Sequence, residues 1–163
     1  MKKAVWSGAI AAAALLISTP VFAQTTATAA LGVTASVNAK AKLSLGVASI
    51  TFPDTDPDVT AVMTSSAVTI DVKARTSGTV TLTVLAGGDL TTGSANIPIT
   101  SLTWTATGSG FIAGANDKTT AQTVGSWAGS GNPNGSQTFS LPNSWSYATG
   151  TYTATLNYTL TVP

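Results

Sequence analysis

Apolar and polar residues alternate along several stretches of this chain. Successive side chains of a β-strand point to opposite faces of the sheet, so this alternation predicts strands that bury one face. The predicted strands cover residues 31–45, 68–75, 79–84, 102–107, 137–141 and 151–162. The first stretch is long enough to form one strand or two in line. The second and third flank Ser77 and Gly78, which predicts a β-hairpin.

Turn-forming residues separate these runs, since Gly, Pro and Asp recur between them. No segment of about ten residues or more has helical spacing, and β-branched Thr and Val dominate the runs. The predicted fold class is therefore all-β. Short antiparallel strands at this spacing are typical of an immunoglobulin-like β-sandwich of about seven to nine strands.

The start of the chain is typical of a secretory leader. Lys2 and Lys3 precede a mostly apolar stretch over residues 4–19, and Ala23 offers a small residue for cleavage. We predict a signal peptide over residues 1–23, followed by a single β-sandwich domain over residues 24–163. No later stretch has the roughly 18 consecutive apolar residues of a membrane span. The expected destination is the periplasm, the cell surface or the extracellular space.

The composition excludes most catalytic chemistry. The chain contains no His, Cys or Glu, so it offers no imidazole base, no thiolate and no disulfide. Asp71, Asp89 and Asp117 are scattered among different segments, with no other acid or base of a suitable kind to pair with. We therefore predict that the protein is not an enzyme and has no catalytic residue.

The net charge argues against nucleic acid as a partner. The whole chain carries seven basic and six acidic residues, and two of the basic residues lie in the predicted leader. The remainder has five basic against six acidic groups, a net charge of 5 − 6 = −1. A nucleic-acid-binding domain is normally strongly basic.

A metal site is one candidate, although no cofactor is otherwise expected. Asp54, Asp56 and Asp58 stand at alternate positions, and three carboxylates converging from a tight turn could bind calcium. The alternative is a Pro-Asp turn in which the Asp side chains accept hydrogen bonds from nearby backbone N–H groups.

Aromatic residues near turns are a second candidate, because exposed rings stack on sugars or anchor a partner. The candidate glycan-stacking residues are Trp127, Trp145 and Tyr147. The alternative is that such rings cap the ends of a core filled by Trp104, Tyr152 and Tyr158.

The N-terminal extended segment, residues 24–38, is a candidate for strand addition to another copy. Its alternating apolar residues are spaced to enter successive pockets of a neighbouring subunit; they are Leu31, Val33, Ala35 and Val37. The alternative is that residues 31–45 form the first strand of their own domain. Both arrangements require the same alternation.

Both ends of the chain resemble chaperone-usher pilins of the spore coat protein U type. The resemblance lies in residues 25–39 and 148–156, where Gly150 and Tyr152 match a Gly-x-Tyr signature before the last strand. It implies a fimbria-like structural subunit at the cell surface that polymerises by strand addition and acts in adhesion. The partners it implies are copies of the chain or related subunits, a periplasmic chaperone and an usher.

A second resemblance is to WxL cell-wall-binding domains. It rests on residues 103–106, which read Thr-Trp-Thr-Ala, and on residues 150–160. It implies the alternative function of a cell-wall or carbohydrate-binding module.

Overall fold

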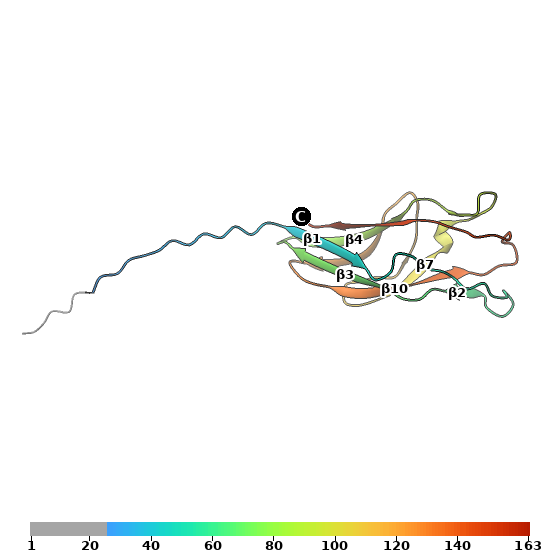
Figure 1. Cartoon of the computed structure of the whole chain (residues 1–163), viewed down its shortest axis with the longest axis horizontal. Coiled ribbons are helices and arrows are strands. Elements are labelled where there is room, and N and C mark those ends of the chain that lie inside the picture. Colours follow the sequence, from blue (N-terminus) through green and yellow to red (C-terminus); the bar gives the residue numbers. More distant parts are fainter. Residues whose placement is uncertain (1–25) are drawn as a thin grey trace, which may run out of the picture. The chain divides into compact units, whose positions relative to one another are not determined.

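A computed structural model describes residues 26–163 of the chain (Figure 1). The predicted leader lies outside the described residues. The chain divides into two units, residues 1–35 and 36–163. The described part of the first unit contains no strand, and its residues are exposed. The second unit contains all the strands, and the only helical element among the described residues is one turn of 3-10 helix, Ile99–Ser101.

The strands form antiparallel sheets, which confirms the all-β prediction. The larger sheet is built from β1 (Lys40–Leu45), β2 (Val62–Thr64), β3 (Val68–Arg75), β7 (Thr103–Thr107), β8 (Gly114–Ala115) and β10 (Asn134–Pro142). Its order is β1-β3-β10-β7-β8, and β2 also pairs with β10. The smaller sheet is built from β4 (Thr79–Ala86), β9 (Gln122–Ala128) and β11 (Leu156–Thr161), in the order β11-β4-β9.

A two-stranded ribbon of β5 (Leu90–Thr91) and β6 (Asn96–Ile97) completes the unit. The part of the chain that the structure describes thus holds eleven strands, and three of them have only two residues. Very short strands of this kind produce no alternation that a sequence reading can detect.

One hydrophobic core receives side chains from both sheets. The alternation predicts the core-facing residues of β3 and β4 correctly; Val68, Ile70, Val72, Val80, Leu82 and Val84 are all buried. Trp104 of β7 and Phe139 of β10 are also buried, with ring centroids 6.4 Å apart. Their Thr neighbours face outward, as the pattern predicts.

The predicted hairpin over residues 68–84 is wrong. β3 pairs with β1 and β10 in the larger sheet, whereas β4 pairs with β9 and β11 in the smaller one. The turn at Ser77 and Gly78 therefore carries the chain from one sheet to the other. Both connections require the same inward apolar pattern, because each strand faces the same core.

The predicted strands at the two ends are shorter in the structure. The run over residues 31–45 forms a strand only from Lys40, which lies opposite Arg75, the last residue of β3. Beyond that pair no neighbouring backbone continues the ladder. The last strand begins at Leu156 rather than at residue 151, and Thr153 makes only an isolated bridge to Thr91.

A β-bulge explains why the alternation does not predict β9. The pairing of β4 with β9 shifts between Leu82 and Thr83, whose partners are Gly125 and Thr123. Val124 is the extra residue, so Val124 and Gly125 are both buried although they are adjacent in sequence. A bulge of this kind breaks the period of two on which a strand prediction depends.

A hydrogen bond connects the two sheets through the core. The Tyr158 hydroxyl of β11 donates to Oε1 of Gln137 in β10. Gln137 is fully buried, and its Nε2 has no partner in the structure. Burial also raises the pKa of Tyr158 above its ordinary value. The Tyr158–Gln137 contact therefore satisfies the oxygen of the one polar side chain that β10 turns into the core, but not its nitrogen.

Replacing Tyr158 with Phe is expected to lower the free energy of unfolding by about 1–2 kcal/mol, because the side chain of Gln137 then loses its only hydrogen-bond partner among the described residues. Urea denaturation measures the change. Tyr152→Phe is the matched control, since the Tyr152 hydroxyl donates to the Ala148 carbonyl at an exposed position. Equal losses in the two variants would contradict this account.

The raised pKa of Tyr158 also predicts a pH dependence of stability. An unfolded Tyr loses its proton near pH 10, about its usual pKa, whereas the folded protein holds this proton to higher pH. The contribution of Tyr158 is therefore complete below about pH 10 and is lost as the pH rises toward the folded pKa. Urea midpoints measured from pH 9 to 11 should fall more steeply for the natural protein than for Tyr158→Phe. Parallel curves would show that Tyr158 does not cause the loss.

Candidate functional site

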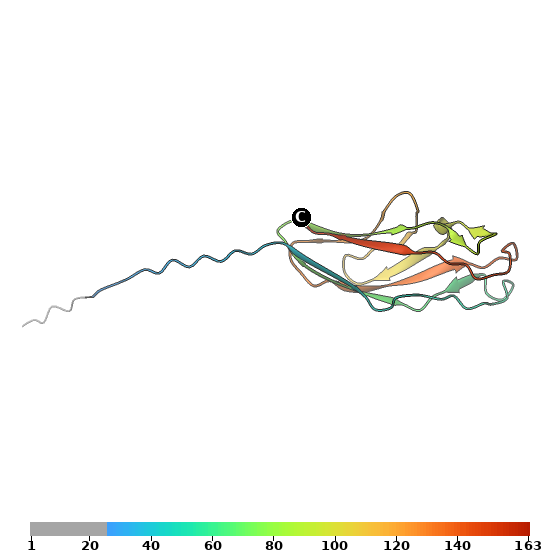
Figure 2. The same ribbon diagram turned by 45° about the horizontal axis from the view of Figure 1, so that its top comes forward.

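The first and last strands of the second unit leave two backbone edges unpaired. Among the described residues β1 pairs only with β3, and β11 pairs only with β4, so each is the terminal strand of its sheet. The two strands lie close to one another on the same side of the unit (Figure 2). An edge strand presents N–H and C=O groups that another strand can bind.

The opposite side of the unit is closed by the chain itself. There β8 extends the larger sheet, and the adjoining segment pairs with β9 of the smaller one through a bridge from Phe111 to Gly125. The Ile112 N–H donates to the Val124 carbonyl at 2.9 Å. The continuous segment from Gly110 to Ala115 thus joins both sheets, so the unpaired pair of edges is confined to the side of β1 and β11.

Apolar side chains along the unpaired side are incompletely covered. Five of them pack against the core but remain half-buried, namely Leu43, Leu156, Tyr158, Leu160 and Val162. The inward residues of β4, the neighbour of β11, are 0–3% exposed. Fully burying a large aliphatic side chain stabilises a protein by about 1.5–3 kcal/mol. Part of that stabilisation is not realised along this side.

The candidate donor residues lie outside every strand. Leu31 is 88% exposed, Val33 84% and Val37 68%, and Ala35 is exposed as well. The described part of the chain contains no strand before Lys40.

The three candidate metal ligands do not converge. Oδ1 of Asp56 accepts a hydrogen bond of 2.9 Å from the Asp58 N–H, which is the Asp turn considered as the alternative. Asp58 Oδ1 instead accepts a bond of 3.1 Å from the indole of Trp145. Among residues 26–163 no three acidic, His or Cys side chains form a group that could bind a metal ion. A calcium site at Asp54 has no support in this geometry.

The structure separates the three candidate glycan-stacking residues. Trp127 lies at the end of β9, where its half-buried ring packs edge-on against Phe111 and its indole donates to the Ser109 carbonyl at 2.8 Å. Tyr147 is half-buried against the core. Only Trp145 is freely accessible, with 70% of its surface exposed.

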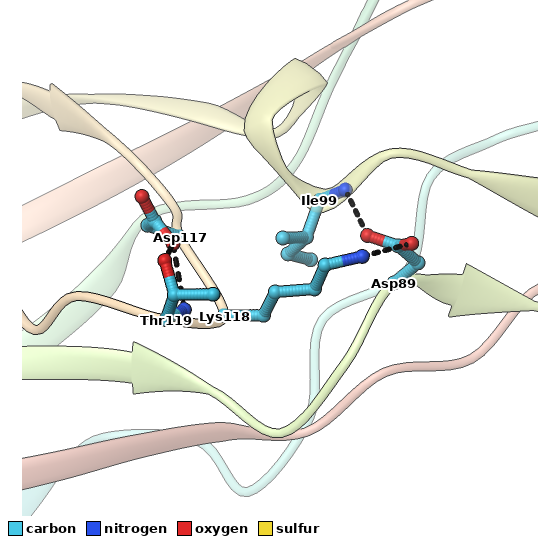
Figure 3. A network of polar contacts seen from close by, with 5 residues as sticks. All are labelled: Asp89, Ile99, Asp117, Lys118 and Thr119. Carbon is cyan, nitrogen blue, oxygen red and sulfur yellow. Dashed lines mark hydrogen bonds and ion pairs between the residues drawn. The ribbon is translucent and has the colours of Figure 1, made fainter.

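Carboxylates elsewhere serve to fix loops. Asp89 accepts bonds from the Lys118 ammonium at 2.6 Å and the Ile99 N–H at 3.0 Å (Figure 3). These contacts hold the pKa of Asp89 below its usual range. Asp117 accepts bonds from the N–H and hydroxyl of Thr119, which lower its pKa likewise (Figure 3). Each carboxylate is therefore engaged in contacts that fix a loop.

Comparisons of the chain with family models, curated proteins and solved structures find no match. Among the described residues, no helix has the length and apolar character needed to cross a membrane. Any assignment of function therefore depends on the fold and on the geometry of the unpaired edges.

Sequence reasoning did not show which strands carry the unpaired edges, and it missed the contact between Trp145 and Asp58. The alternation along residues 156–162 marks the inward side chains of β11 correctly. It carries no signal for how many neighbours a strand has. The Trp145–Asp58 contact joins residues 87 positions apart, and neither residue type predicts that the other lies beside it.

Proposed function

We propose that the protein is a non-enzymatic, exported structural subunit that polymerises by strand addition, with an immunoglobulin-like β-sandwich as its body. The observation that carries this proposal is the pair of unpaired edges, β1 and β11, beside half-buried apolar side chains. A strand from another copy would pair with an exposed edge and cover these side chains in one step.

The chain also contains a segment suited to this role. Residues 26–39 form no strand, and the exposed apolar residues from Leu31 to Ala39 recur at every second position. An inserted strand needs this spacing, because only alternate side chains face the core of the recipient. The low charge of the chain, 8% of residues, suits a surface that is largely covered in an assembly.

A fimbria-like assembly at the cell surface is the setting that this reading favours. The basic and apolar character of residues 1–23 supports export. Copies of this chain or related subunits are the proposed partners. A periplasmic chaperone and usher would be required if the resemblance to spore coat protein U pilins reflects kinship.

Two double variants test the strand-addition proposal. Leu31→Asp with Val33→Asp places two charges on the apolar face of the donor segment and should keep the protein monomeric. Thr34→Asp with Ser36→Asp adds the same charge to the opposite face and should leave polymerisation intact. Sedimentation velocity measures the distribution of polymer lengths.

Deleting residues 24–38 should abolish assembly in the same measurement, because it removes the donor strand. Unchanged polymers from the Leu31→Asp and Val33→Asp variant would refute strand addition by this segment. Equal loss of polymers in both double variants would show that the added charge alone, rather than its place on the apolar face, prevents assembly.

A specific observation favours carbohydrate binding as a second candidate function. Trp145 is the most exposed aromatic side chain among residues 26–163, and its indole N–H bonds the exposed carboxylate of Asp58. A ring for stacking beside a hydrogen-bond acceptor is a combination suited to sugars.

For this candidate, Trp145→Ala should weaken retention of the protein on insoluble cell-wall polysaccharide by about tenfold, which corresponds to the energy of one aromatic contact. Val59→Ala is the matched control, since Val59 is 83% exposed nearby but has no ring. A co-sedimentation assay gives both values. No retention of the natural protein on any glycan would remove this candidate.

A further inference from the structure

Four basic side chains gather on one face of the larger sheet. Lys40 lies directly opposite Arg75, and Lys42 lies opposite Lys73, in the pairing of β1 with β3. Residues opposite one another in an antiparallel pair share a face, and the two pairs are two residues apart, so all four side chains point outward together. We call this surface the basic face. All four residues are exposed.

The basic face is not neutralised within the chain. Asp71 shares the face, opposite Ser44. Among residues 26–163, however, the only ion pair joins Lys118 to Asp89. Like charges opposite one another destabilise a sheet. Lysines are common on edge strands, where they limit unspecific pairing, but Lys73 and Arg75 belong to β3, which is paired on both sides. Edge protection therefore does not account for the basic face.

Complementary charge lies at the other end of the same unit. Asp54, Asp56 and Asp58 are all exposed, and the chain has no basic residue between residues 43 and 72 or after residue 118. We call the loop over residues 54–58 the acidic tip. Exposed apolar side chains border it, namely Val59, Val62 and Trp145.

The register of β10 separates the two charged surfaces. Asn134 at the start of β10 pairs with Asp71 on the basic face. At its other end β10 continues into Asn143, whose side-chain amide donates to the Thr55 carbonyl in the acidic tip at 2.8 Å. The nine residues of β10 span roughly 30 Å. One copy therefore cannot bring its own tip onto its basic face.

We propose that the acidic tip of one copy binds the basic face of the next, so that copies join head to tail. This inference rests on the proposed function, since it gives the orientation of copies within that assembly. A contact between two different surfaces of the same chain repeats from copy to copy, so it builds a ring or an open filament rather than a symmetric dimer. Charge complementarity also steers the encounter and rejects the reverse orientation, which would bring like charges together.

Zero-length carbodiimide cross-linking tests the contact in the natural protein. The reagent joins a carboxylate to an amine only when the two touch. A mixture of isotopically light and heavy copies should give mixed-isotope links from Asp54, Asp56 or Asp58 to Lys40, Lys42 or Lys73. The Lys118–Asp89 pair, with 2.6 Å between its charged atoms, provides an internal control within each copy.

The intermolecular links should disappear at about 1 M salt, where charges are screened beyond about 3 Å. The Lys118–Asp89 link should persist at a higher yield than the intermolecular links. Assemblies that show the internal control link but no link between tip and basic face would overturn the proposal.

Charge reversal supplies a second test. Lys42→Glu with Lys73→Glu should weaken association at least about tenfold at low salt, and so should Asp54→Lys with Asp58→Lys. All four substitutions in one chain should restore association, because the two surfaces are complementary again. Sedimentation velocity measures each variant.

The outcomes also distinguish this inference from the strand-addition proposal. Loss of association on reversing the basic face, with no effect of reversing the tip, would overturn the head-to-tail contact. Failure of strand addition would instead show as undiminished polymers of the Leu31→Asp and Val33→Asp variant. The two proposals are tested by variants at different residues, so one proposal can be refuted while the other stands.

Discussion

The burial of alternate side chains between two sheets is the interaction on which the rest of the structure depends. The chain contains no Cys, so no disulfide holds the sheets together, and the core itself must stabilise the fold. Central strands such as β3 and β4 bury nearly all of one face, because each has neighbours on both sides. β1 and β11 bury theirs only in part. The unpaired edges at β1 and β11 thus follow from the same need to bury alternate side chains that builds the core.

Closure of the unit is asymmetric, and this asymmetry connects the fold to the proposed function. One side is closed by the chain between Gly110 and Ala115, which bonds to both sheets. The other side ends in β1 and β11, where half-buried apolar side chains lie beside unpaired backbone. Under the proposed function, a strand from another copy would bind on this second side.

The sequence predicts which side chains face the core but not which strands are neighbours. Alternation identifies Ile70 and Leu82 as core residues, since the period of two follows from backbone geometry alone. The alternation wrongly places these two residues in one hairpin, because a turn within a sheet and a turn between two sheets give the same alternation of apolar and polar residues. Alternation does not predict β9, because the bulge at Val124 breaks the period of two. Contacts such as Lys42 with Lys73 depend on register, which composition does not encode.

Hydrogen–deuterium exchange of the second unit tests the central claim, that the unpaired edges accept a strand. A synthetic peptide of residues 26–39 is added to the protein that lacks residues 24–38, and a peptide with Asp in place of Leu31 and Val33 is the control. The account predicts slower exchange of backbone amides in β1 and β11 with the natural peptide only. Unchanged exchange in these two strands, or equal protection by both peptides, would contradict it.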